Sequence, residues 1–167
     1  MTANCSRQEN IGPAQQDTGT LLLEYWLPAD AKSVPEARRQ AQQICEAVGV
    51  SDDECFSLDL ALGEALANAV VHGTPSPDRP EPSDHHVFLG MWDYDHHLIV
   101  EVHDRGPGFR PPPPPYQMPA PDTETTHGRG LPLMQMLTDA MIVCRGDAER
   151  GGASIYLVKH LEHRHRN

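Results

Sequence analysis

A line of polar residues runs along an otherwise apolar segment between Glu64 and Gly73. Glu64, Asn68 and His72 stand four residues apart, and alanine, leucine and valine fill the positions between them. Side chains at this spacing share one face of an α-helix. Polar side chains are costly to bury without partners. We therefore expect this face of the helix to bind a ligand, and a metal-bound ligand is one candidate.

Composition restricts the class of protein. The 167 residues suffice for one domain with its own core and are few for two. Acidic residues outnumber basic ones by 24 to 13, and the formal net charge of −11 argues against direct binding of nucleic acid. The apolar runs are too short to cross a membrane, and residues 1–16 lack the apolar core of a signal peptide. We therefore expect a cytoplasmic protein.

The order of polar, proline-rich and apolar segments predicts one folded domain. Residues 1–19 are expected to be a disordered leader, 20–162 the domain and 163–167 a tail. The proline-rich segment 74–83 is expected to be a loop with no role that we can assign. Periodicity and turn residues predict strands at 21–27, 86–92, 97–103, 140–145 and 153–160, and helices at 35–48, 52–71 and 131–137.

Two glycine-containing segments follow the polar line. Asp104-Arg105-Gly106-Pro107-Gly108 comes at the end of a predicted strand, and Gly128-Arg129-Gly130 precedes a predicted helix. An aspartate at a strand end can accept a hydrogen bond from an exocyclic amine such as that of adenine. A glycine pair at a helix start lets the backbone approach a phosphate, whose charge the helix N-terminus favours.

The polar line itself offers groups for phosphate chemistry. Asn68 has a neutral oxygen of the kind that suits Mg²⁺, an ion that takes few protein ligands. Glu64, one helical turn away, can take a proton from an attacking hydroxyl or water.

Each of these motifs also has a plainer interpretation. Glu64 and Asn68 could belong to the solvated face of a helix, and Asp104 could cap a turn. Gly128 and Gly130 could be ordinary loop glycines. Their order and spacing together favour the functional interpretation over these alternatives.

Histidines elsewhere are interpreted as structural or surface residues. His72 is expected to pack at the end of its helix. The pairs at 85–86 and 96–97 flank a predicted hairpin beside aspartates, which suggests a metal site. Neighbouring strand residues point to opposite faces, so we interpret these histidines as a polar surface.

In this order, the segments 63–73, 104–109 and 128–134 resemble the ATP-binding Bergerat fold of type II topoisomerases, mismatch-repair ATPases and sensor histidine kinases. With the closing segment 151–160, the chain most resembles the small bacterial anti-sigma-factor serine/threonine kinases, over residues 21–161. The resemblance implies a two-layer α/β sandwich with about three helices on one face of a mixed, mostly antiparallel sheet.

The resemblance also implies a role for each motif. Glu64 would be the general base, and Asn68 would ligate Mg²⁺. Residues 110–127 would form the lid over ATP; they contain five consecutive prolines and no lysine, so basic contacts with the triphosphate would come from Arg129 and from Arg105 or Arg110. The nucleotide-binding positions around adenine and the phosphates would be Asn68, Asp104, Gly106, Gly108, Gly128, Arg129, Gly130 and Leu131.

Proteins of this family sequester a sigma factor and phosphorylate a serine or threonine of an antagonist. We therefore expect an ATP- and Mg²⁺-dependent serine/threonine protein kinase that acts as an anti-sigma regulatory factor. Its partners would be a sigma factor and an anti-sigma-factor antagonist, and the family suggests a homodimer. The alternative is a nucleotide-gated protein-binding regulator without kinase activity. The presence of Glu64 favours the enzyme, because a pure binding protein needs no base.

Overall fold

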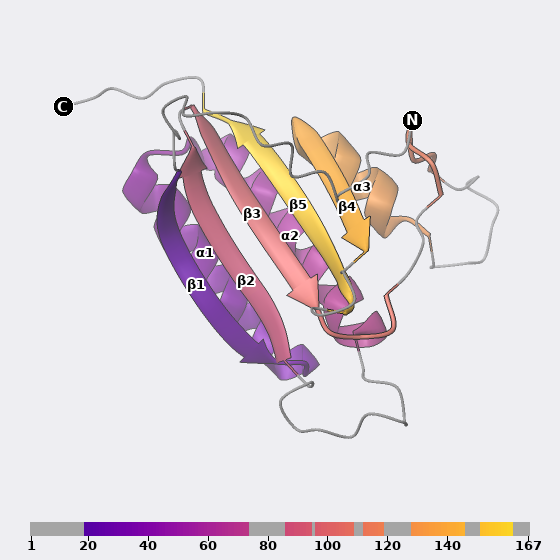
Figure 1. The fold of residues 1–167 in the computed structure, drawn as a ribbon. Helices are drawn as coiled ribbons and strands as arrows, with labels where there is room; N and C mark the ends of the chain where they lie inside the picture. Colours follow the sequence, from indigo (N-terminus) through magenta and orange to yellow (C-terminus); the bar gives the residue numbers. More distant parts are fainter. Residues whose placement is uncertain are drawn as a thin grey trace, which may run out of the picture.

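A computed structural model gives the fold of the chain (Figure 1). It describes residues 19–73, 86–94, 96–108, 112–118, 128–145 and 151–161. The elements, in chain order, are β1 (Thr20–Pro28), the 3-10 helix η1 (Ala31–Ser33), α1 (Val34–Val48), α2 (Asp52–His72), β2 (His86–Tyr94), β3 (His97–Asp104), α3 (Gly130–Leu137), β4 (Ala140–Arg145) and β5 (Ala153–His160).

All predicted helices and strands are present, with ends that differ by at most two residues from the prediction. The predicted leader lies outside the described residues except for Gly19, and so do the tail 163–167 and the proline-rich loop 74–83. The predicted lid is described only at 112–118. None of the helices in the described part of the chain has the length and apolar character that crossing a lipid bilayer requires.

The five strands form one sheet in the order β1-β2-β3-β5-β4. Figure 1 shows the helices together on one face of this sheet, so the predicted two-layer α/β sandwich is confirmed. The described strand pairs are all antiparallel, which makes the sheet more regular than the mixed sheet expected. Alternate residues of the two central strands β2 and β3 face the helices and are at most 2% exposed: Val87, Leu89, Met91, Leu98, Val100 and Val102.

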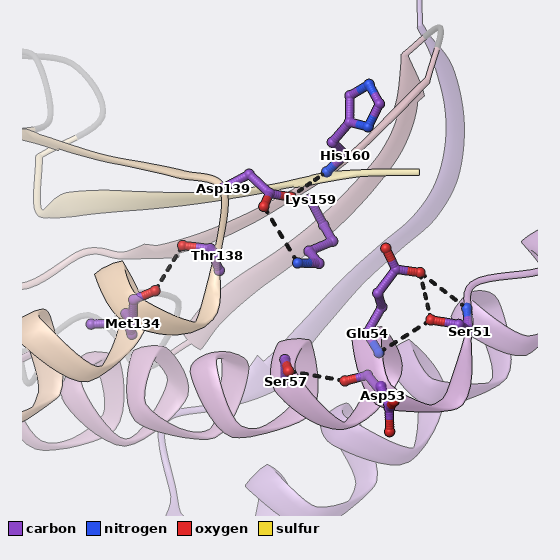
Figure 2. A network of polar contacts seen from close by, with 9 residues as sticks. All are labelled: Ser51, Asp53, Glu54, Ser57, Met134, Thr138, Asp139, Lys159 and His160. Carbon is purple, nitrogen blue, oxygen red and sulfur yellow. Dashed lines mark hydrogen bonds and ion pairs between the residues drawn. The ribbon is translucent and has the colours of Figure 1, made fainter. Parts of the chain in front are cut away.

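The helix that carries the polar line, α2, is held in register at its start and along its inner face. A capping box joins Ser51 and Glu54, in which each side chain meets the other residue's backbone N–H (Figure 2). Leu58, Leu62 and Leu66 follow at four-residue spacing and are at most 1% exposed. These three leucines form an apolar seam that packs into the core, so the side of α2 that carries the polar line faces away from the core and toward α3.

The end of α3 is tied to the sheet by short polar contacts (Figure 2). The Thr138 hydroxyl donates to the Met134 carbonyl oxygen at 2.7 Å. The Asp139 carboxylate accepts the backbone N–H of His160 at 2.6 Å and lies 3.4 Å from the Lys159 ammonium. The Thr138 bond closes the last turn of α3, and the Asp139 contacts join the corner between α3 and β4 to β5.

The face of the sheet opposite the helices carries a polar network that the sequence did not reveal. Glu101 and Ser154 are 7% and 6% exposed. Tyr156 and Ser154 both donate hydrogen bonds to the same Glu101 oxygen, at 2.8 and 3.1 Å. His103 Nδ1 lies 2.9 Å from the Ser154 hydroxyl. Burial, reinforced by the bond to Glu101, raises the pKa of Tyr156.

Candidate functional site

A cavity of about 360 Å³ lies between α2, the end of β3, the start of β5 and the start of α3. Its volume falls within the range that small-molecule sites occupy. The three sequence motifs, far apart in the chain, meet around it. The predicted site residues that line the cavity are Asn68, Asp104, Gly108, Gly128, Gly130 and Leu131.

The rest of the cavity wall is mainly apolar and was not predicted from the sequence. Ala65 and Ala69 belong to α2, where their short side chains leave open the space that a leucine would fill. Nothing in the pattern distinguishes these alanines from core residues. A cavity with apolar walls and few polar groups suits an aromatic ring. The remaining apolar lining residues are Val102, Pro107, Ala153 and Ile155.

Asp104 is the acidic residue that lines this cavity. It is the last residue of β3, and one carboxylate oxygen accepts the backbone N–H of Gly106 at 2.9 Å. Burial raises the pKa of Asp104, while the bond from Gly106 and the nearby His103 and His72 partly oppose that rise. A carboxylate has lone pairs for several donors, so Asp104 can accept a ligand amine while it keeps its bond to Gly106.

Glu64 and Asn68 converge on the first residue of α3. A Cβ atom added to Gly130 would lie 3.1 Å from the Glu64 carboxylate oxygen Oε2 and 3.2 Å from the Asn68 amide nitrogen. Asn68 lines the cavity, whereas Glu64 lies next to it at the Gly130 edge. A side chain at position 130 would fit only if the ends of Glu64 and Asn68 moved by a few tenths of an ångström. A carboxylate and a carboxamide therefore lie together beside Gly130 at the edge of the cavity.

His72, the third residue of the polar line, also lines the cavity. We interpreted it from the sequence as a residue that packs at the helix end, so this position adds it to the candidate binding residues. The loop after β3 packs directly on this end of α2. A Cβ added to Gly106 would lie 2.6 Å from the His72 carbonyl oxygen. Gly106 therefore permits this packing and does not itself line the cavity.

Two further glycines bring the end of β3 close to the start of β5. Gly108 has a φ of +69°, and a Cβ there would lie 2.7 Å from the Gly152 carbonyl oxygen. Gly152 has a φ of +65°, and its Cβ would overlap the Asp104 carbonyl oxygen. Residues with side chains rarely adopt such φ values. Gly152 thus supports the backbone of Asp104, a role that local sequence patterns did not indicate.

The arginines expected near the phosphates do not all lie at the cavity. The Arg105 guanidinium stacks over the Trp26 ring, 5.1 Å from its centroid. Trp26 is on the outer face of the sheet, since the next residue, Leu27, faces the core. Arg129 is exposed and directly precedes α3 beside the lining glycines 128 and 130. Arg110 lies outside the described residues.

One described part of the predicted lid contacts α3. The backbone N–H of Tyr116 donates to the Gln135 side-chain oxygen at 3.1 Å. Tyr116 therefore contacts the same helix whose first turn borders the cavity.

The hairpin histidines form no metal cluster within the described residues, where no three His, Cys, Asp or Glu side chains gather as metal ligands. His97 instead lies edge-on to His160, with ring centroids 5.0 Å apart. His85 and Asp95 fall outside the described residues.

Comparisons with known proteins agree with this geometry. The chain is similar to the solved RsbU and RsbW domains of Rv1364c from Mycobacterium tuberculosis, with a TM-score of 0.59 and 18% identity over 83% of this chain and 31% of that one. It is also similar to the SiaB–SiaC complex from Pseudomonas aeruginosa, with a TM-score of 0.56 and 12% identity over 83% of this chain and 89% of that one. At these identities the likeness shows a shared fold.

Sequence comparison with curated proteins finds no match. The family model for the histidine kinase-like ATPase domain matches residues 27–159, which include the three motifs that meet around the cavity. The chain therefore belongs to the histidine kinase-like ATPase domain family.

Proposed function

We propose that this protein is an ATP-dependent serine/threonine protein kinase that acts as an anti-sigma regulatory factor and phosphorylates an anti-sigma-factor antagonist. The observation that carries the proposal is the convergence of Glu64 and Asn68 on Gly130, at the edge of a cavity that contains Asp104. The similarity to an RsbW domain and to SiaB adds support from the fold.

The cavity fits an adenine nucleotide. Its walls are apolar apart from Asn68, His72 and Asp104, and so suit a flat base. The Asp104 carboxylate would accept the exocyclic amine of adenine. The phosphates would then extend toward Gly128 and Gly130, where backbone N–H groups at the start of α3 and the Arg129 guanidinium favour negative charge.

The donor set beside Gly130 fits Mg²⁺. Asn68 would hold the ion through its carboxamide oxygen, a ligand type that Mg²⁺ accepts while it takes few other protein ligands. A bound Mg²⁺ neutralises the charge that develops on the phosphates during transfer. The position of Glu64 next to Asn68 leaves its carboxylate free for a different task at the acceptor hydroxyl.

In the proposed reaction, Glu64 takes the proton of a serine or threonine hydroxyl. The hydroxyl oxygen forms a bond to the γ-phosphorus, and the bond from that phosphorus to the β–γ bridging oxygen breaks. ADP leaves with the electron pair. The protein contributes chiefly by positioning these groups and by offsetting their charge.

Incubation with γ-labelled ATP, Mg²⁺ and purified small proteins encoded beside this gene tests the proposal. We expect the label on one of those proteins as an acid-stable phosphoester of serine or threonine. An acid-labile phosphohistidine would indicate a different class of kinase. If ATP binds but no candidate protein takes up label, the nucleotide-gated binding regulator replaces the kinase.

The affinity for ATP is expected to depend on pH through Asp104. Because burial raises the pKa of this carboxyl, protonation removes the amine acceptor at a higher pH than for an exposed aspartate. Protonation of Asp104 has the opposite effect on the stability of the fold. An acid whose pKa is raised by folding makes the folded state less stable as pH rises from its unfolded to its folded pKa, so acidification should favour the fold while it weakens ATP binding.

Titration of a fluorescent adenine nucleotide from about pH 8 down to about pH 4 would measure this dependence. The dissociation constant of the wild type should rise toward acid pH, and that of Asp104→Asn should stay nearly flat. An affinity of the wild type that does not change over this range would contradict an ionised Asp104 as the acceptor.

A further inference from the structure

The outward face of α2 carries an exposed apolar stripe. Phe56 and Val71 are each 65% exposed and Leu60 is 36% exposed. With Gly63 and the exposed Ala67 between them, they follow at intervals of three and four residues, so all five share one side of the helix. We call these residues (Phe56, Leu60, Gly63, Ala67 and Val71) the α2 stripe.

The α2 stripe is separate from the apolar seam that holds α2 in the core. That seam is formed by Leu58, Leu62 and Leu66, which are at most 1% exposed. A helix that is apolar on two sides is typical of a helix buried on both. Exposed contiguous apolar residues on a soluble protein mark interaction sites. The α2 stripe therefore has the character of a surface that a partner covers.

One flank of the α2 stripe is formed by an ion pair between helices. Arg38 of α1 donates through Nε to Asp59 of α2 at 2.8 Å, and its guanidinium lies over Gly63, 3.6 Å from where a Cβ would stand. Asp59 holds the guanidinium and raises the pKa of Arg38. This flank is thus charge-neutral, and the guanidinium partly covers the stripe at Gly63.

The other flank leads directly to the proposed transfer site. Glu64 follows Gly63 in sequence and lies about 100° around the helix from it. Its carboxylate reaches the first residue of α3, Gly130, at the edge of the nucleotide cavity. A protein seated on the α2 stripe would therefore adjoin Glu64, the residue proposed to accept the hydroxyl proton.

Charge indicates which partner fits. Asp52, Asp53 and Glu54 occupy the first turn of α2, at the Phe56 end of the stripe. The chain as a whole carries a formal charge of −11. A second copy of this chain would bring like charges together, whereas a partner with lysines or arginines around an apolar patch would be attracted.

From these observations we infer that the α2 stripe is the docking surface for the protein that receives the phosphate. This inference rests on the proposed kinase function and extends it. The acceptor would place an apolar patch with a basic rim on Phe56 and Leu60 and present its serine or threonine to Glu64. The α2 stripe would determine which hydroxyl-bearing protein is selected, and the nucleotide cavity would be unaffected by its loss.

Photocrosslinking tests the identity of the occupant. Benzoylphenylalanine in place of Phe56 keeps an aromatic group at this position in the full chain, and the same residue in place of Ile142 is the control. Ile142 is 49% exposed on the edge strand β4. We expect position 56 to crosslink, in the producing cells, the same protein that takes up label from ATP. A crosslink from 56 only to a second copy of this chain, or none at all, would overturn the inference.

Steady-state kinetics with that acceptor provide the second test. Phe56→Lys should raise KM for the acceptor by about tenfold or more, since aromatic anchors dominate interfaces, without change in kcat or in nucleotide affinity. Ile142→Lys, at an exposed edge-strand position where lysine is well tolerated, should leave KM unchanged. Circular dichroism checks that both variants fold.

The results separate this inference from the proposed function. If a protein is phosphorylated and Phe56→Lys leaves its KM unchanged, the docking surface is wrong and the kinase stands. If position 56 crosslinks a protein but ATP-bound chain phosphorylates nothing, the kinase function fails, and the acceptor role of that partner fails with it.

Discussion

We expect Glu64→Gln to lower the rate of phosphoryl transfer by about two to four orders of magnitude, the usual contribution of a general base. Glutamine has nearly the same shape as glutamate but cannot take a proton from the acceptor hydroxyl at neutral pH. The contact with Gly130 should survive, because the amide fills the same space beside the start of α3.

Nucleotide affinity should be spared in Glu64→Gln, because Glu64 lies at the edge of the cavity and does not line it. Single-turnover transfer from labelled ATP and an independent binding titration would separate the two quantities. Glu46→Gln, an exposed change on α1, is the matched control and should behave as the wild type. Transfer by Glu64→Gln at the wild-type rate would rule out Glu64 as the base.

Asp104→Asn is expected to weaken ATP binding by about 10- to 100-fold, the cost of losing a hydrogen bond to a charged acceptor. Asp104 already accepts the Gly106 N–H at 2.9 Å and a backbone hydrogen bond from Ala153, and the proposed adenine amine is a further donor. Asparagine has one acceptor oxygen and one NH₂ group. In either orientation of the amide, its NH₂ group would face the Gly106 N–H or the adenine amine, and both of these are donors.

The binding titration for Asp104→Asn needs a control at a carboxylate with similar backbone bonding. Asp139 also accepts a backbone N–H, that of His160, and does not line the cavity. Asp139→Asn should keep its ATP affinity even if its melting temperature falls. Wild-type affinity in a folded Asp104→Asn variant would contradict the adenine assignment.

Local sequence patterns were sufficient for the elements that position the site. The bounds of β4 and β5 match the prediction, and α2 begins at the predicted residue, Asp52, where Ser51 and Glu54 form a capping box within one turn. The order of the three motifs also predicted that Asn68, Asp104 and Gly130 meet around one cavity. These features depend on residues that are near one another in the chain or on a resemblance to a known family.

Features that depend on strand order were not predictable. Glu101 meets Ser154 and Tyr156 only because β3 pairs with β5, and more than fifty residues separate them in the chain. Arg105 stacks on Trp26 because β1, β2 and β3 lie side by side, so its expected role near the phosphates was not supported. Local sequence periodicity does not predict contacts between residues so far apart in the chain.

Because Gly130 has no side chain, the start of α3 lies close to Glu64 and Asn68 of α2. A Cβ atom at Gly130 would lie 3.1 Å from the Glu64 carboxylate and 3.2 Å from the Asn68 amide nitrogen, so both side chains border the space that a larger residue would need. The bond from Tyr116 to Gln135 ties residues of the predicted lid to that same helix. Any shift of α3 transmitted through this bond would change the distance from Gly130 to both Glu64 and Asn68, the proposed base and the proposed metal ligand.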